Sequence, residues 1–221
     1  MKMHIALLIV IMSLTACQKT TKTSPLSRGD WTLPFGDWKF AFFTPYALPA
    51  LVTHVRLIDT AGYLYHFFDL DPTRDDHMTR EAWSRTTRSA SLRFNHASFP
   101  PQYMVFCWDS IIDMKVYETS IFFPRSVWEK MRTPASYKAR SGATVWYSTM
   151  LFGLAPEGKV RVWLQDVGEH PNYLIPGLKM KTVSGDQLDI CRDITKHPNG
   201  YKYYGDTPAF IKGKTYPYGE W

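Results

Sequence analysis

The sequence predicts an α+β domain made mainly of antiparallel β-strands, a sandwich-like sheet of hairpins with one or two short helices. Apolar runs rich in β-branched and aromatic residues fill residues 103–165, and turn-forming residues separate them in pairs. Val160, Val162 and Leu164 alternate with Arg161, Trp163 and Gln165, which is the period of a strand with one face on a core and the other toward solvent or a partner. The segment Ala-Pro-Glu-Gly at 155–158 joins two such runs, because proline and glycine supply the backbone angles of a tight turn.

The central stretch, 103–165, is interpreted as two hairpins of one antiparallel sheet that forms the core of the molecule. In its second run, Tyr117, Thr119, Ile121 and Phe123 are expected to share one face, because side chains alternate along a strand.

The other predicted elements surround this centre. They are strands at 38–43 and 178–183, a hairpin of 54–59 and 63–70 around Thr60-Ala61-Gly62, and a helix at 125–132. The strand at 38–43 is expected at a sheet edge, and the hairpin is expected in the same layer as the central strands. The helix has Ser126 as its candidate N-cap.

The N-terminus predicts export and lipidation. Lys2 precedes an apolar segment, 5–14, that is too short to span a bilayer. The Leu-Thr-Ala-Cys sequence that ends at Cys17 resembles the lipobox of bacterial lipoproteins, which implies a signal peptide over 1–16 and acylation of Cys17. Gln18 in place of Asp implies sorting to the outer membrane, facing the periplasm. An ordinary secretory signal or a buried helix with an incidental cysteine is the alternative.

The rest of the chain divides into a tether and one domain. The polar residues that follow Cys17 predict a flexible tether over 17–29, and 30–221 predicts a single globular periplasmic domain. Twenty-six Lys and Arg against 20 Asp and Glu give a formal net charge of +6, which favours acidic protein surfaces or anionic lipid head groups as partners. The charges are scattered, so no nucleic-acid partner is expected.

Two cysteines remain in the domain, Cys107 and Cys191. In an oxidising compartment they could form a disulfide that closes a long loop. Cys107 lies in an apolar strand, however, and a buried thiol that behaves as a small hydrophobic side chain is the alternative.

No motif predicts catalysis. The sequence has no Gly-x-Ser-x-Gly, no His-Glu-x-x-His and no phosphate-binding glycine loop, and no histidine has metal-ligand spacing to a second histidine or a cysteine. We therefore expect no catalytic residues, no metal and no cofactor, and a binding protein in place of an enzyme.

A polar, arginine-rich segment at 71–88 is the predicted contact surface for a partner. Arginine and tryptophan are enriched where interfaces concentrate their binding energy. The candidate contact residues are Arg74, Arg80, Trp83, Arg85 and Arg88. The alternative is a solvated loop or surface helix.

Three stretches of the sequence are similar to those of a family of proteobacterial lipoproteins defined only as a domain of unknown function. They are WDSIIDMKVYETSIFFP, LFGLAPEGKVRVWLQ and the closing TYPYGEW, and the similarity extends over most of the mature chain. Some members resemble immunity proteins of type VI secretion phospholipase effectors. The resemblance implies a lipid-anchored periplasmic immunity protein that binds and neutralises a lipase-type toxin. The alternative is a structural or saccharide-binding envelope lipoprotein with no toxin partner, suggested by eight Trp and thirteen Tyr that could stack on sugars.

Overall fold

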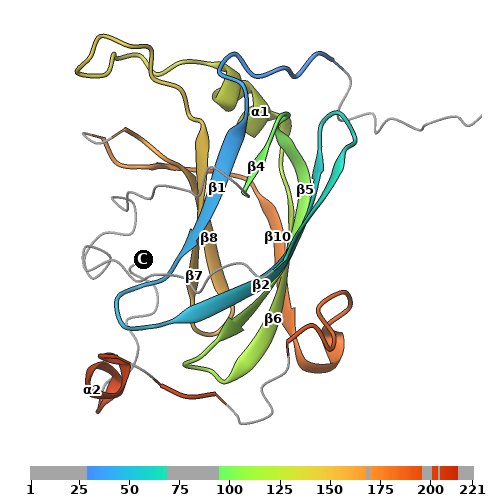
Figure 1. Cartoon of the computed structure of the whole chain (residues 1–221), viewed down its shortest axis with the longest axis vertical. Coiled ribbons are helices and arrows are strands. Elements are labelled where there is room, and N and C mark those ends of the chain that lie inside the picture. Colours follow the sequence, from blue (N-terminus) through green and yellow to red (C-terminus); the bar gives the residue numbers. More distant parts are fainter. Residues whose placement is uncertain (1–28, 69–94, 168–169, 196–200, 204, 214–221) are drawn as a thin grey trace, which may run out of the picture.

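The computed structural model describes residues 29–68, 95–167, 170–195, 201–203 and 205–213, which form two five-stranded sheets packed as a sandwich (Figure 1). The first sheet has the strand order β4-β1-β7-β8-β9, and the second sheet has the order β10-β6-β5-β2-β3. The strands are β1 (Trp38–Phe43), β2 (Ala50–Asp59), β3 (Leu64–Phe68), β4 (His96–Ala97), β5 (Pro101–Ser110), β6 (Lys115–Phe122), β7 (Thr149–Ala155), β8 (Lys159–Leu164), β9 (Tyr173–Leu174) and β10 (Lys179–Ser184). The described helices are α1 (Arg125–Arg132) and the short α2 (Thr207–Ile211), with a 3-10 turn at Gly185–Gln187. The predicted fold class is confirmed.

Each hairpin forms where its local pattern predicts it. The β2–β3 turn is stabilised by Asp59, whose Oδ1 accepts the backbone N–H groups of Ala61 and Tyr63 at 2.9 and 3.0 Å. In β6, Tyr117, Thr119 and Ile121 are buried while the residues between them are less so, which confirms the predicted alternation.

Two predictions about sheet assignment are wrong. The two central hairpins do not share a sheet: β5–β6 belongs to the second sheet and β7–β8 to the first. Nor is β1 an edge strand, since it pairs in parallel with β7 along its length and with the two-residue β4 on its other side. Local alternation identifies a hairpin but carries no information about which sheet it joins, and here α1 and residues 133–148 take the chain from one sheet to the other.

The core lies between the sheets and is largely aromatic. Trp38, Phe40 and Phe152 from the first sheet meet Phe106 and Trp108 from the second. Phe40 and Phe152 meet edge to face with centroids 6.3 Å apart, an arrangement that the quadrupoles of the rings favour.

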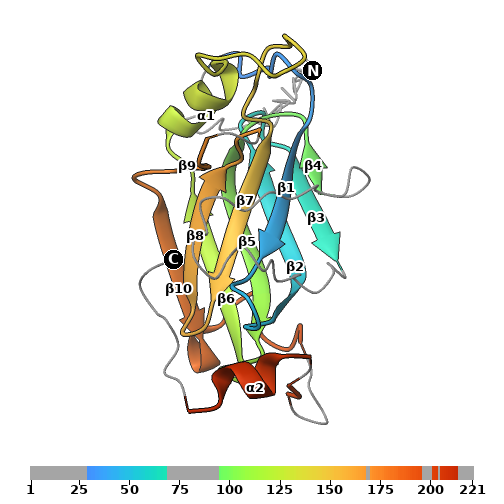
Figure 2. The ribbon, with the colours of Figure 1, turned by 90° about the vertical axis from the view of Figure 1, so that its left-hand side faces the viewer.

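Helix α1 closes one end of this core, and α2 lies at the opposite end (Figure 2). Val127, Trp128 and Met131 of α1 are buried, and Trp128 Nε1 donates a hydrogen bond to the carbonyl of Pro101 at 2.6 Å. Pro124 occupies the N-cap position and the helix has no side-chain cap, so the predicted role of Ser126 is wrong.

Candidate functional site

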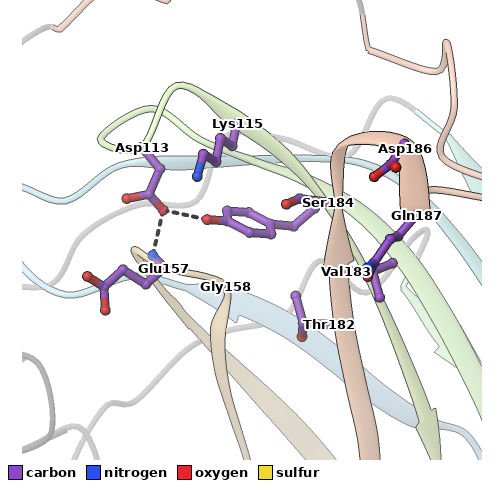
Figure 3. Close-up of a pocket in the computed structure, with 10 residues that line it drawn as sticks. Asp113, Lys115, Glu157, Gly158, Thr182, Val183, Ser184, Asp186 and Gln187 are labelled. Carbon is purple, nitrogen blue, oxygen red and sulfur yellow. Dashed lines mark hydrogen bonds between the residues drawn. The ribbon is translucent and has the colours of Figure 1, made fainter.

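A pocket of about 450 Å³ opens where parts of both sheets meet (Figure 3). The β7–β8 turn that contributes to it lies at the same end of the sandwich as α2 (Figure 2). The β5–β6 turn, the β7–β8 turn and the end of β10 with the 3-10 turn line it. The lining residues are Asp113, Lys115, Tyr117, Glu157, Gly158, Thr182, Val183, Ser184, Asp186 and Gln187. The pocket is therefore a product of tertiary structure, because its three contributing segments are far apart in the sequence.

Asp113 joins the two hairpin turns across this pocket. Its Oδ2 accepts the hydroxyl of Tyr117 at 3.0 Å and the backbone N–H of Glu157 at 2.5 Å, as the dashed lines in Figure 3 show. A carboxylate that accepts two hydrogen bonds is held in one orientation. The β7–β8 turn of the first sheet is thus fastened to the β5–β6 turn of the second.

Gly158 allows the close approach of the two turns. Its φ of +71° is a conformation that residues with a Cβ rarely adopt. A Cβ built there would lie 3.0 Å from Cε1 of Tyr117 and 3.1 Å from Cγ2 of Thr182. Glycine is required at this position for backbone conformation and for space.

Replacing Gly158 by alanine is expected to destabilise the protein by about 2 kcal/mol, through left-handed backbone strain and contact with Tyr117. Gly177→Ala is the matched control, because its φ is +69° and nothing lies within 4 Å of the added Cβ. Urea unfolding of both variants separates the two causes. A loss no greater in Gly158→Ala than in Gly177→Ala would contradict the packing contribution.

The pocket is lined mainly by hydrogen-bonding and charged side chains. Burial, followed by the neighbouring Asp113 carboxylate, raises the pKa of Tyr117 above its usual value, so its hydroxyl remains a hydrogen-bond donor at neutral pH. Thr182 and Ser184 contribute aliphatic hydroxyl groups, and the residues that line the pocket include no histidine. Lys115, Glu157 and Asp186 make the rim charged and of mixed sign.

Cys107 and Cys191 form a disulfide in the structure, with their Cα atoms 5.4 Å apart. The bond attaches residues 185–195 to the outer surface of β5 and β6. Leu188, Val116 and Val183 pack around it, and the Glu118 carboxylate accepts the backbone N–H groups of Asp189 and Cys191 at 2.9 and 3.0 Å. The sequence alone could not decide between a disulfide and a buried thiol, because it does not reveal the distance between the two cysteines.

The other predicted site residues cannot be placed by the structure. Cys17 and the predicted contact residues Arg74, Arg80, Trp83, Arg85 and Arg88 lie outside the described residues. Tyr117 and Gly158 were not predicted to be pocket residues. The Ala-Pro-Glu-Gly turn was the available signal, but it does not reveal what the turn packs against.

Within the described ranges, no three or more His, Cys, Asp or Glu side chains are grouped so that they could hold a metal ion. In the same part of the chain, no helix has both the length and the apolar character needed to cross a membrane.

Residues 17–219 match the family described as "Protein of unknown function (DUF2931)". The chain belongs to this family. The match covers almost the whole sequence and includes every residue of both sheets. No curated protein and no solved structure matches the chain.

Proposed function

We propose that the protein is a lipid-anchored periplasmic immunity protein that binds and neutralises a lipase-type toxin. The observation that carries the proposal furthest is the Cys107–Cys191 disulfide, because such bonds persist in oxidising compartments and are rare in the cytosol. The lipobox-like sequence before Cys17 also supports a location outside the cytosol. The DUF2931 match begins at Cys17.

The surface of the domain supports a binding role. Leu64, Phe68 and Phe122 are each more than half exposed on the second sheet, and exposed apolar side chains of this size often mark protein interaction sites. A lipid anchor would hold this binding surface close to the phospholipids that such a toxin attacks. Confinement of that kind raises the effective concentration of the inhibitor.

The test uses cells that produce the full chain and receive a lipase-type effector encoded beside its gene, directed to the periplasm. We expect wild type to restore growth and to co-purify with the effector. We expect Cys17→Ser to lose palmitate labelling and membrane attachment, and to protect less well. A catalytically inactive effector provides the control for toxicity that does not depend on lipid hydrolysis.

Undiminished killing in the presence of the wild-type chain, with no complex recovered, would contradict the proposed function. Retention of palmitate labelling by Cys17→Ser would contradict the anchoring part alone.

The positions of the described tryptophans give no specific support to saccharide binding. Among the described tryptophans, only Trp146 is not buried, and it lies beside Phe35 with ring centroids 5.9 Å apart. The buried ones are Trp31, Trp38, Trp108, Trp128 and Trp163. Rings in these positions fill the core, which accounts for their number.

A further inference from the structure

We propose that the outer surface of the second sheet is the contact site for the partner, and that the partner presents an apolar centre flanked by carboxylates. This inference rests on the proposed function and names the surface through which the protein would bind the toxin. The surface, called here the cationic sheet face, consists of two neighbouring rows of outward side chains. The rows are Lys179, Phe122, Tyr103, Ile58 and Leu64, and Lys181, Ser120, Val105, Arg56 and His66.

Strand pairing places these side chains together. Residues paired across an antiparallel sheet point to the same side, and Ile58 pairs with both Tyr103 and Leu64. The intervening row contains Met104 and Ile121, which are fully buried in the core. The two rows of the cationic sheet face therefore point away from the core.

Part of the apolar surface of this face is exposed, although Val105 in the second row is only 5% exposed. Leu64 and Phe122 are 58% and 54% exposed, and the ring of Phe122 lies 4.6 Å from that of Tyr103. The outer surface of the first sheet differs, because its Phe43 and Trp163 are buried. Of the two outer surfaces, the second sheet thus has the exposed aromatic centre that protein interfaces use.

The charges of the face are positive. Arg56, Lys179 and Lys181 form no ion pair with any residue that the structure describes, and neither row contains an acidic side chain. The carboxylates of Glu118 and Asp189 border the face on the side of the crossing segment 185–195, where the Glu118 carboxylate is already bonded by two backbone N–H groups. Lys179 and Lys181 lie on the edge strand β10, and Arg56 lies near the opposite edge.

Arg56 is positioned for a carboxylate. Its Nε donates to Nε2 of His54 at 3.2 Å. Neither Nη group bonds to a residue that the structure describes, and two Nη groups can bind a carboxylate through two bonds. Burial first, and then the Arg56 charge, lower the pKa of His54, which keeps its imidazole neutral and able to accept this bond. The neutral His54 thus orients the guanidinium without cancelling its charge.

These charges favour a different protein over a second copy of this chain. A two-fold self-association through the face would bring the same cations toward one another, and like charges across an interface oppose binding. Rigid strand-borne side chains with an aromatic centre and an arginine match the composition of protein interfaces better than that of a lipid-binding segment.

The experiment measures the affinity of the full chain, in detergent micelles, for the inactivated lipase-type effector immobilised on a sensor. Arg56→Glu is expected to weaken binding about 30-fold or more, and Leu64→Ala about fivefold. Arg56→Lys should lose part of the affinity, because it keeps the charge but not the two-bond geometry. The pair Lys179→Glu and Lys181→Glu on the exposed edge strand provides a second charge reversal that does not touch His54.

The matched controls are on the first sheet. Arg161→Glu reverses an exposed strand cation, and Leu174→Ala truncates a leucine that is 50% exposed. Both should bind within about twofold of wild type. Thermal unfolding confirms that each variant is folded.

Four results would overturn the assignment. If wild type binds the effector and the face variants bind within about twofold of it, the contact lies elsewhere and the proposed function stands. Loss of binding on reversing Arg74, Arg80, Arg85 and Arg88, with the face variants unaffected, would locate it in the arginine-rich segment. If the face variants abolish only self-association or binding to phosphatidylglycerol vesicles, the face serves that other contact.

Failure of wild type to bind the effector removes the proposed function and this inference together.

Discussion

Replacing Cys107 and Cys191 together by alanine is expected to lower the free energy of unfolding by about 4 kcal/mol. The disulfide joins residues 84 positions apart, so its removal releases a long loop in the unfolded chain and raises the entropy of that state. Both cysteines are almost fully buried, and their cluster with Leu188 and Val183 would lose packing as well. The loss is a large fraction of the stability of an ordinary domain, which is roughly 5–15 kcal/mol.

The measurement is equilibrium unfolding in urea of wild type, the double variant and wild type in reducing agent. Reduced wild type and the double variant should unfold at similar concentrations, both well below oxidised wild type. Limited proteolysis should cleave residues 185–195 faster once the disulfide is absent, because that segment is held to the sheet by this bond and by Glu118. Equal unfolding midpoints for the oxidised and reduced proteins would contradict the expected stabilisation.

Truncation of Trp108 to alanine is expected to destabilise the protein by about 4 kcal/mol. The side chain is fully buried on the inner face of β5, and its ring stacks on Tyr117 with centroids 4.7 Å apart. Its Nε1 donates to Oγ1 of Thr119 at 2.9 Å, and that oxygen lies 2.9 Å from Oγ1 of Thr182. The variant would leave a cavity and remove a hydrogen bond that links β5 to β6 and β10.

Two companion variants separate these contributions. Trp108→Phe keeps much of the ring volume and removes the donor, so it should cost less than Trp108→Ala. Thr119→Val keeps the shape and leaves the indole N–H without its partner, which should cost about 2 kcal/mol. Thermal unfolding followed by near-ultraviolet circular dichroism reports all three. A loss below about 1 kcal/mol for Trp108→Ala would show that the surrounding core collapses around the site.

The sequence determined the local elements because their signals are local. Alternating apolar residues and a proline–glycine turn define the β7–β8 hairpin, and an amphipathic run after Pro124 defines α1. The hairpin around residues 60–62 was predictable for the same reason, and Asp59 stabilises it through neighbours two and four residues away. The lipobox-like sequence before Cys17 is likewise local, although no described residue tests it.

Tertiary structure alone decided which sheet each hairpin joins. The parallel pairing of β1 with β7 joins Lys39 to Thr149, and no pattern within either strand specifies a partner so distant. Trp163 shows the same limit: alternation places it opposite Val162, but only packing shows that its side of the strand is also buried.

The candidate site also depends partly on local sequence and partly on tertiary packing. The turn that contains Gly158 was predictable from its residues, whereas its contacts with Tyr117 and Thr182 depend on how the two sheets pack. The sequence placed Phe122 on the side of its strand opposite Ile121, yet whether that side is covered or exposed depends on residues elsewhere in the chain. The alternation of side chains along a strand is set by neighbouring residues. Burial and strand pairing are set by segments that meet only after the chain has folded.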